Sequence, residues 1–353
     1  MMTSTAIDLF CGIGGLTKGL SLAGVNVQAG IDIDNSCRFA YEKNNNAQFI
    51  NCDITLLKGE QLEALYPDNT TRILVGCAPC QPFSKYTNRY RKDGHTDDKW
   101  KLLYSFSRLV QEIQPEIVSM ENVPQLENEK VFSDFVSSLE KLNYFVDWKV
   151  VYCPKYGVPQ NRKRLILLAS RLKKITLIAP LYDEEHYPTV RQAIGKLPRL
   201  RDGEQDVNDS LHRACRLSTI NLRRIRQSVP GGTWRDWDEE LQLKCHKKET
   251  GKTYGSVYGR MSWDEPSPTI TTQFYGYGNG RFGHPEQDRA LSLREGAVLQ
   301  SFPIDYVFCD DEHPANKREI GTHIGNAVPV ELGRAIGISI QKHLQEVEKN
   351  GTS

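Results

Sequence analysis

The chain has 353 residues, a formal net charge of +1, 39% hydrophobic residues and 25% charged residues. This composition is ordinary for a soluble globular protein, and the lack of a long apolar run excludes a transmembrane helix. The N-terminus has no basic start followed by an apolar stretch, so no secretory signal is expected. Nine cysteines are spread along the chain, which predicts a reduced cytoplasmic protein with free thiols.

Short apolar runs alternate with amphipathic stretches through the first half of the chain. The runs predict strands at 6–10, 27–31, 73–77, 117–120, 145–151 and 165–169, and the stretches predict helices at 16–23, 36–43, 61–65, 102–113 and 131–142. This alternation is typical of an α/β fold, with a doubly wound, mostly parallel sheet covered by helices on both faces. Ligands of such sheets bind at the carboxyl ends of the strands.

The character of the chain changes near residue 170. Residues 172–285 are irregular, polar and rich in glycine and proline, which predicts a smaller, loop-rich region. Helical character returns at 291–300 and at 330–346. Residues 155–226 hold sixteen lysines and arginines against seven acidic residues. That excess suits a polyphosphate partner, although a solvated basic surface has the same composition.

A glycine-rich turn follows the first strand, in Asp8-Leu9-Phe10-Cys11-Gly12-Ile13-Gly14-Gly15. Glycines let a ligand approach the backbone closely, and the helix N-terminus that follows attracts negative charge such as a carboxylate. The spacing departs from the dinucleotide fingerprint, because Thr17 stands where its third glycine would be. An ordinary tight turn would carry the same glycines.

Two acidic residues lie at the ends of the next two strand segments. Asp32, twenty residues after Gly12, can accept hydrogen bonds from both ribose hydroxyls. Asp53 can accept from an adenine amino group, with Ile54 against the ring. Either acid alone is more often a helix cap or a surface carboxylate. With the glycine turn they predict an adenosine-shaped site, which suits a nicotinamide cofactor as well as S-adenosylmethionine.

The fourth strand runs into Gly76-Cys77-Ala78-Pro79-Cys80-Gln81-Pro82. Cys80, between two prolines, is held on a stiff loop at the ligand edge of the sheet, a placement that suits a nucleophile. Cys77 and Cys80 also form a C-x-x-C pair, which is typical of a redox disulfide or of half a zinc site. No second pair of ligands with metal spacing follows, so no metal site is expected.

A carboxylate and a basic block follow in the same half of the chain. Glu121, in Glu121-Asn122-Val123-Pro124, ends the fifth strand and is expected to face the same crevice as Cys80. Gln160-Asn161-Arg162-Lys163-Arg164 leads into the next strand. Arginines there can orient a carboxylate or hold a phosphate. A surface acid and a solvated basic loop would have the same sequence.

The order of these blocks resembles that of the DNA cytosine-5 methyltransferases over nearly the full length of the chain. Pro79-Cys80-Gln81 is similar to the nucleophile motif, Glu121-Asn122-Val123 to the third signature and residues 160–164 to the basic one. The late block at 289–303 and Gly325-Asn326-Ala327-Val328-Pro329 follow in the family's order. Six blocks in order, with the glycine turn first, are far more specific than any single pattern.

The resemblance implies a catalytic set, Cys80, Glu121, Arg162 and Arg164, and S-adenosylmethionine as cofactor, with S-adenosylhomocysteine as product. The residues implied to hold the cofactor are Phe10, Gly12, Gly14, Gly15, Asp32, Ile33, Asp53, Ile54, Pro79, Leu103, Asn326 and Val328. Position 33 departs from the family pattern, in which an aromatic residue is often found, so Ile33 would stack less well on adenine.

The resemblance also implies an organisation and a set of partners. Residues 1–170 would form the catalytic and cofactor-binding domain, 171–288 the target-recognition domain, and 289–353 the late motif helix and a return segment that completes the catalytic domain. The partner would be double-stranded DNA in the cytoplasm, where the enzyme associates with the nucleoid. We expect a monomer without membrane association, with a separate cognate restriction endonuclease.

The implied reaction begins when the Cys80 thiolate adds to C6 of a cytosine flipped out of the duplex. Glu121 would donate a proton to N3, Arg162 and Arg164 would supply positive charge, and Arg164 would hold the carbonyl oxygen of the base. An RNA cytosine-5 methyltransferase of the same fold and a catalytically silent DNA-binding module stay open as alternatives. The long recognition region disfavours the first, and the complete catalytic set disfavours the second.

Three further expectations concern the loops. Residues 84–101 are predicted to form a mobile lid over the flipped base. The glycine-rich segment at 276–283 is predicted to approach DNA closely. The aromatic residues of the recognition region, among them Trp234, Trp237 and Tyr258, are expected to pack inside it rather than to stack on bases.

Overall fold

A computed structural model describes residues 3–79, 101–248, 255, 257–314 and 316–351. The chain divides into two compact units. The first unit comprises Met1–Tyr152, Lys163–Pro180 and Val328–Ser353, and the second comprises Cys153–Arg162 and Leu181–Ala327.

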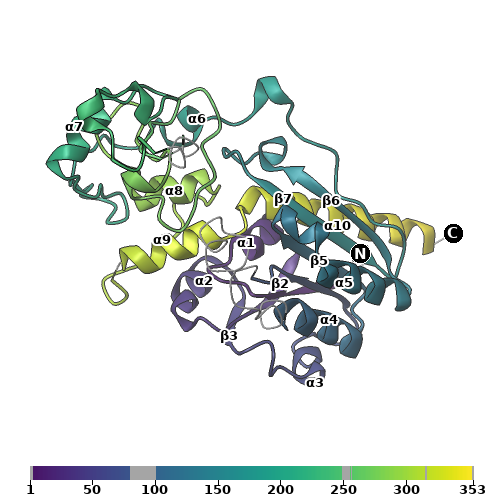
Figure 1. The fold of residues 1–353 in the computed structure, drawn as a ribbon. Helices are drawn as coiled ribbons and strands as arrows, with labels where there is room; N and C mark the ends of the chain where they lie inside the picture. The colour runs from purple at the N-terminus through teal and green to yellow at the C-terminus, as the bar shows by residue number, and fades with distance from the viewer. Residues whose placement is uncertain (1–2, 80–100, 249–254, 256, 315, 352–353) are drawn as a thin grey trace. The chain divides into compact units, whose positions relative to one another are not determined.

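The described part of the first unit is built on one seven-stranded sheet with the order β3-β2-β1-β4-β5-β7-β6 (Figure 1). The strands are β1 (Ser4–Leu9), β2 (Asn26–Asp32), β3 (Gln48–Asn51), β4 (Thr71–Gly76), β5 (Ile117–Asn122), β6 (Phe145–Tyr152) and β7 (Lys163–Ser170). Strands β1 to β5 pair in parallel, whereas β7 pairs antiparallel with both β5 and β6. The predicted strands and the mostly parallel sheet are confirmed.

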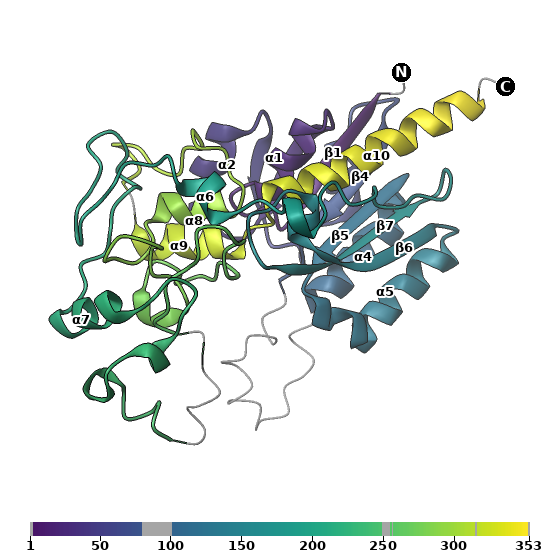
Figure 2. The same ribbon diagram turned by 90° about the horizontal axis from the view of Figure 1, so that it is seen from above.

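Helices cover both faces of this sheet. They are α1 (Gly15–Leu22), α2 (Arg38–Asn44), α3 (Gly59–Glu63), α4 (Lys101–Ile113), α5 (Lys130–Lys141) and α10 (Val330–Gly351), with the short helices η1 (Asn35–Cys37) and η4 (Pro124–Asn128). Figure 2 shows α1 and α10 on one side of the sheet and α4 and α5 on the other. The main apolar core lies under α4 and α5, where Phe106 and Phe135 pack against strand residues such as Leu74.

The C-terminal helix α10 packs closely against α1 because glycines remove the side chains between them. A Cβ atom on Gly19 would lie 2.3 Å from the carbonyl oxygen of Val330. A Cβ atom on Gly337 would lie 2.6 Å from the Cβ atom of Ala23. No real side chain tolerates such separations, so this return of the chain depends on glycine at both helices.

The second unit consists of short helices joined by irregular segments. Its helices are η5 (Cys153–Tyr156), η6 (Glu184–His186), α6 (Val190–Ile194), α7 (Thr219–Gln227), η7 (Trp234–Asp236), η8 (Glu239–Leu241), η9 (Tyr277–Asn279), α8 (Leu293–Leu299) and α9 (Lys317–Asn326). The loop-rich character and the helix near 291–300 were predicted. Helices α7 and α9 were not. Across both units, the described residues include no helix that is long and apolar enough to cross a membrane.

An aromatic cluster forms a small core in the second unit. Trp234 and Trp237 are each 4% exposed and pack with Ile225 and Tyr277. The indole nitrogen of Trp237 donates to Ser228 Oγ at 2.8 Å. The prediction that these tryptophans pack inside the region is therefore confirmed.

The glycines at 276–283 are explained by packing within the unit. A Cβ atom on Gly278 would lie 2.9 Å from the ring of Tyr258, and one on Gly283 would lie 2.9 Å from the carbonyl oxygen of Gly259. These glycines permit close internal approach whether or not the segment also contacts DNA. The expected approach to DNA stays a prediction.

Candidate active site

The glycine turn after β1 has an unusual backbone. Phe10 has φ 59° and Gly12 has φ 49°, both in the left-handed region, and Gly14 at the N-cap of α1 has φ 83°. A phenylalanine in that region is strained, and such strain persists where the surroundings impose it. A Cβ atom on Gly12 would meet nothing within 4 Å. The turn therefore presents bare backbone to open space, as a cradle for a ligand requires.

Asp32 ties the end of β2 to this turn. Its Oδ2 accepts a hydrogen bond from the Gly12 amide at 2.8 Å, and its Oδ1 accepts from the Asp34 amide at 2.9 Å. Ile33 follows with 68% of its surface exposed. A carboxylate and an exposed apolar side chain thus flank the cradle at adjacent positions, in the arrangement expected for the ribose and base of an adenosine.

The other residues expected around adenine make contacts within the protein. Asp53 Oδ1 accepts from both the amide and the hydroxyl of Thr55, each at 2.8 Å, so it caps the turn that follows it. Ile54 and Leu103 are 2% and 3% exposed and belong to the apolar core. Of Ile33, Ile54 and Leu103, Ile33 alone presents substantial surface.

Asp8 forms a buried polar contact beneath the turn that the motif spacing did not indicate. The carboxylate is 1% exposed and accepts a 2.7 Å hydrogen bond from Thr17 Oγ1, which lies 3.1 Å from the hydroxyl of Tyr41. Burial raises the pKa of Asp8 to about 7, against the opposing effect of the Thr17 hydrogen bond. Thr17, which breaks the dinucleotide spacing, is thus the partner of this carboxyl group.

Glu121 lies at the carboxyl end of β5 and is 2% exposed. Its Oε1 lies 2.7 Å from Nε of Arg164 on the neighbouring strand β7, where the two form an ion pair. Its Oε2 lies 2.7 Å from Sγ of Cys77, just past the end of β4. The structure therefore brings together two of the four predicted catalytic residues, because β4, β5 and β7 are neighbours in the sheet.

The remaining predicted residues fall elsewhere. Cys80 and residues 84–100 of the expected lid lie outside the described residues, whereas Lys101 begins α4; Pro79, the last residue described before them, is exposed. Arg162 and Asn326 belong to the second unit, whereas Val328 belongs to the first. Arg162 is 5% exposed, and its Nη1 donates to Gln160 Oε1 at 3.1 Å and to the carbonyl of Ile270 at 3.0 Å.

Two buried glutamines connect the motif blocks of the second unit. Gln160 Nε2 donates to Gln300 Oε1 at 2.9 Å, and Gln300 Nε2 donates to the carbonyl of Ile324 at 2.7 Å. Both side chains are 0% exposed. The basic block, the late block and the segment before Asn326 are therefore held together by amide hydrogen bonds. Both glutamines lie within sequence motifs, but the motifs alone gave neither of them a role.

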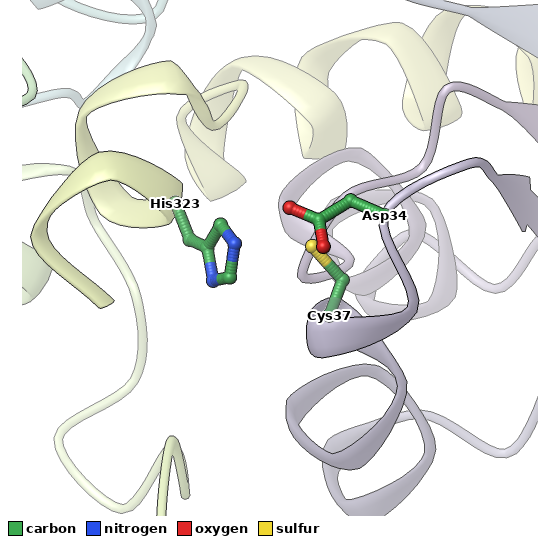
Figure 3. Close-up of side chains that lie close together, drawn as sticks. All are labelled: Asp34, Cys37 and His323. Carbon is green, nitrogen blue, oxygen red and sulfur yellow. The ribbon is translucent and has the colours of Figure 1, made fainter. Parts of the chain in front are cut away.

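Asp34 and Cys37 lie close together around η1 (Figure 3). The Asp34 carboxylate caps this helix by accepting from the Ser36 amide at 3.0 Å, and Cys37 is 2% exposed. His323, also drawn in Figure 3, is part of the second unit. One carboxylate and one thiol from the first unit are fewer ligands than a zinc ion requires, so we assign no metal to them.

A family model supplies the identity of the chain. The model for the C-5 cytosine-specific DNA methylases matches residues 4–342. The chain belongs to this family. It is accordingly a DNA cytosine-5 methyltransferase, as the order of its sequence motifs predicted.

Two bacterial relatives agree with this assignment, and a solved structure shares the fold. The methyltransferase is 55% identical to the Type II methylase M.HgiDII of Herpetosiphon aurantiacus, over 98% of this chain and 97% of the relative. It is 31% identical to the Type II methyltransferase M1.HphI of Haemophilus parahaemolyticus, over 97% and 87% of the two chains. A prophage-encoded E. coli protein, described as a DNA modification methyltransferase, has the same fold with TM-score 0.71, 22% identity and coverage of 97% and 100%.

The family assignment implies a methyl donor, and the glycine turn fits one. Gly12 leaves open space beside the backbone, and Asp32 places a carboxylate on the same turn. This donor set consists of backbone, carboxylate and apolar surface, which matches an adenosine-containing organic cofactor better than a metal ion.

Proposed function

We propose that this methyltransferase methylates C5 of a cytosine within a specific double-stranded DNA sequence, with S-adenosylmethionine as methyl donor, and so protects that sequence from a separate cognate restriction endonuclease. The observation that carries the proposal is the ion pair between buried Glu121, at the carboxyl end of β5, and partly buried Arg164, at the start of β7, beside the segment that leads to Cys80. The names of its bacterial relatives support the restriction-modification role.

The chemistry requires a nucleophile because C5 of cytosine is itself a poor one. The Cys80 thiolate forms a bond to C6, and the electron pair of the C5–C6 double bond moves into the ring as N3 takes a proton from Glu121. C5 then has enamine character. Bound S-adenosylmethionine supplies an electrophilic methyl group for this carbon. A base then removes the C5 proton, which re-forms the C5–C6 double bond and expels the Cys80 thiolate, and N3 returns its proton to Glu121.

Glu121 and Arg164 divide the work on the base. The ion pair with Arg164 Nε keeps one oxygen of the carboxyl group, Oε1, beside the guanidinium. We assign the outer nitrogen Nη2 of Arg164 to the carbonyl oxygen of cytosine, where charge develops during attack. Glu121 is 2% exposed and the Arg164 side chain is 13% exposed, so their mutual contact is stronger than it would be at the open surface.

Binding of the cofactor rests on the turn after β1. Asp32 would accept from the ribose hydroxyls while its oxygens also hold the Gly12 and Asp34 amides. Ile33 would cover one face of adenine. Glycines 12, 14 and 15 would let the methionine part approach the backbone at the start of α1.

The target cytosine must leave the duplex to reach Cys80, at a cost of a few kcal/mol. The excess of lysine and arginine at 155–226 would offset that cost through phosphate contacts. Most of this stretch belongs to the second unit. We therefore assign target recognition to that unit, with double-stranded DNA as its partner.

The test begins with bisulfite sequencing of host DNA with and without the gene, which gives the target sequence. A duplex carrying 5-fluorocytosine at that position is then incubated with enzyme and S-adenosylmethionine. Fluorine cannot be removed as a proton, so the Cys80–C6 bond persists and the complex survives a denaturing gel. Wild type should form this complex, and Cys80→Ala should not. The Cys309→Ser variant replaces a thiol that is hydrogen-bonded to the Ser210 hydroxyl. It serves as the matched control.

Three results would contradict the proposal. Full methylation by Cys80→Ala would remove the nucleophile assignment. Methylation of transfer RNA with none of duplex DNA would instead favour the RNA enzyme of the same fold. Sequence-specific DNA binding without any transfer would identify the silent module.

A further inference from the structure

Cys77 contacts the carboxyl group of the proposed acid, although the mechanism above does not use it. Its amide donates to the carbonyl of Leu9 at 3.3 Å, which fixes it at the end of β4 beside β1. From there its Sγ lies 2.7 Å from Oε2 of Glu121. A second contact holds the same loop, since Asn122 Nδ2 donates to the carbonyl of Ala78 at 2.9 Å.

We propose that Cys77 is a positioning residue, whose thiol sets the orientation of the Glu121 carboxyl group and marks Oε2 as the oxygen that delivers the proton to the base. The inference deepens the proposed function and rests on it, because it assumes that Glu121 is the acid.

The two oxygens of Glu121 have different neighbours. Oε1 lies 2.7 Å from Nε of Arg164 in an ion pair without hydrogen-bond geometry, and the positive charge of the guanidinium opposes a proton on this oxygen. Oε2 lies against a thiol, which is both a weak donor and a weak acceptor. A thiol can therefore hold Oε2 when it is ionised and equally when it carries a proton. The proton that goes to cytosine is accordingly placed on Oε2.

A thiol suits this position better than the alternatives. An apolar side chain would leave Oε2, in a carboxyl group that is 2% exposed, without its partner at residue 77. The carboxyl group could then rotate about its soft terminal torsion. A serine hydroxyl also offers a donor and an acceptor at this position. It forms stronger hydrogen bonds than a thiol, but the serine side chain is shorter. We therefore expect serine to preserve the function in part and alanine to lose it.

The experiment measures single-turnover methylation of the target duplex at saturating DNA and S-adenosylmethionine. Cys77→Ala should lower the rate about tenfold, the size expected for loss of one hydrogen bond to a reacting group, and should leave the KM for DNA nearly unchanged. Cys77→Ser should recover most of that loss. Cys309→Ser again controls for removal of a thiol.

A double-mutant cycle separates positioning from general structural damage. In a Glu121→Gln background, where residue 121 no longer carries an acid, Cys77→Ala should lower the residual rate no further. A tenfold loss in both backgrounds would overturn the proposal, because it would show that Cys77 acts independently of Glu121. Wild-type activity of Cys77→Ala would overturn it as well. Thermal unfolding checks that each variant folds, and Cys77→Val, an apolar side chain of similar size, replaces alanine in the cycle if the alanine variant does not fold.

The same cycle tells failure of this inference from failure of the proposed function. Should Glu121→Gln itself keep the full rate, the assignment of the acid is wrong and the role of Cys77 falls with it. Should Glu121→Gln be impaired while Cys77→Ala is not, the proposed function stands and only the positioning role of Cys77 is refuted.

Discussion

The two units of this methyltransferase are stabilised by different means. In the first, backbone pairing across seven strands and an apolar core under α4 and α5 hold the fold. In the second, buried polar side chains bond to irregular backbone. Arg260, for example, is 5% exposed, and its Nη1 donates to the carbonyls of His284 and Gln287 at 2.9 and 2.7 Å. A region without long ladders needs such anchors, because buried backbone groups must still find partners.

One anchor of the second unit is a buried ion pair. Arg289 is 0% exposed and Glu295 is 1% exposed, and Nη1 and Nη2 of the arginine donate to the two carboxylate oxygens at 2.8 and 2.7 Å. Burial alone would raise the pKa of Glu295, but the hydrogen bonds and charge of Arg289 hold it at about 2. Glu295 also accepts from the Ser292 amide and so caps α8.

The largest expected effect comes from breaking this pair. Arg289→Met leaves the Glu295 carboxylate buried without its counter-charge, and should lower the free energy of unfolding of the second unit by about 3–5 kcal/mol. Urea unfolding followed by a hydrogen-exchange pulse, read by peptide mass spectrometry, assigns the loss to a unit. The first unit should unfold at its original urea concentration.

The matched control is Arg199→Met, which breaks the exposed pair with Glu286. Solvent and salt screen that pair, so no measurable change is expected. Equal stability of the two variants would contradict the view that buried polar anchors, rather than surface charges, hold the second unit.

The first unit also has a buried carboxyl group, that of Asp8, which forms no ion pair with any basic residue that the structure describes. Because burial raises the pKa of Asp8 to about 7 from 3.8 in the unfolded chain, the folded state holds a proton that the unfolded state releases. The contribution of Asp8 to the free energy of unfolding is complete below pH 3.8. It is lost as the pH rises to 7, by about 4 kcal/mol at most. Asp8→Asn keeps an acceptor for Thr17 and does not titrate. The stability of its first unit, relative to that of wild type, should therefore increase as the pH rises from 4 to 7.

Urea midpoints of the first unit at pH 5, 6, 7 and 8, each followed by an exchange pulse at one fixed pH, measure this difference. Thr17→Val is the companion variant, since it removes the hydroxyl donor and leaves the carboxyl group. A constant difference between Asp8→Asn and wild type over this range would show that Asp8 does not titrate there.

This contrast also explains what could be predicted from the sequence. The strands of the first unit contain short apolar runs and, apart from β3, were predicted with their ranges. The antiparallel pairing of β7 was not predicted, because the order of strands in a sheet cannot be read from local sequence periodicity. In α7 one residue, Ile225, is buried, so the sequence has no apolar stripe from which this helix could be predicted. Helix α9 contains Gly321 and Gly325, which pack against Tyr275 and Thr271 and weaken its local signal.

The candidate site divides in the same way. The meeting of Glu121 with Arg164 follows from residues at the ends of strands, and motif order indicated it. The contacts of Cys77 and Asp8 depend on side-chain separations that no spacing encodes. Ile54 and Leu103 match the family pattern in sequence, and both are buried. Whether such a residue faces a ligand or the core depends on side-chain packing, which the sequence pattern does not specify.

The smallest of the three effects should have the opposite pH dependence, and it belongs to the second unit. Burial lowers the pKa of His284 from 6.5 to about 4, and its Nδ1 accepts from the amides of Glu286 and Gln287 at 3.1 and 3.0 Å. A protonated ring could not accept there. The stability from His284 is therefore complete above pH 6.5 and is lost as the pH falls to 4, by about 3 kcal/mol at most.

His284→Asn offers an acceptor at the position of Nδ1 and does not titrate, so it should lack the acid-induced loss of the second unit. The measurement is the same urea series, extended to pH 4.5, with exchange peptides from 281–300 as the reporter. Acidification should thus weaken the second unit while it strengthens the first through Asp8. If both units lose stability together below pH 6, global charge repulsion outweighs the titration of Asp8 and His284. The two units would then not differ in the pH dependence of their stability.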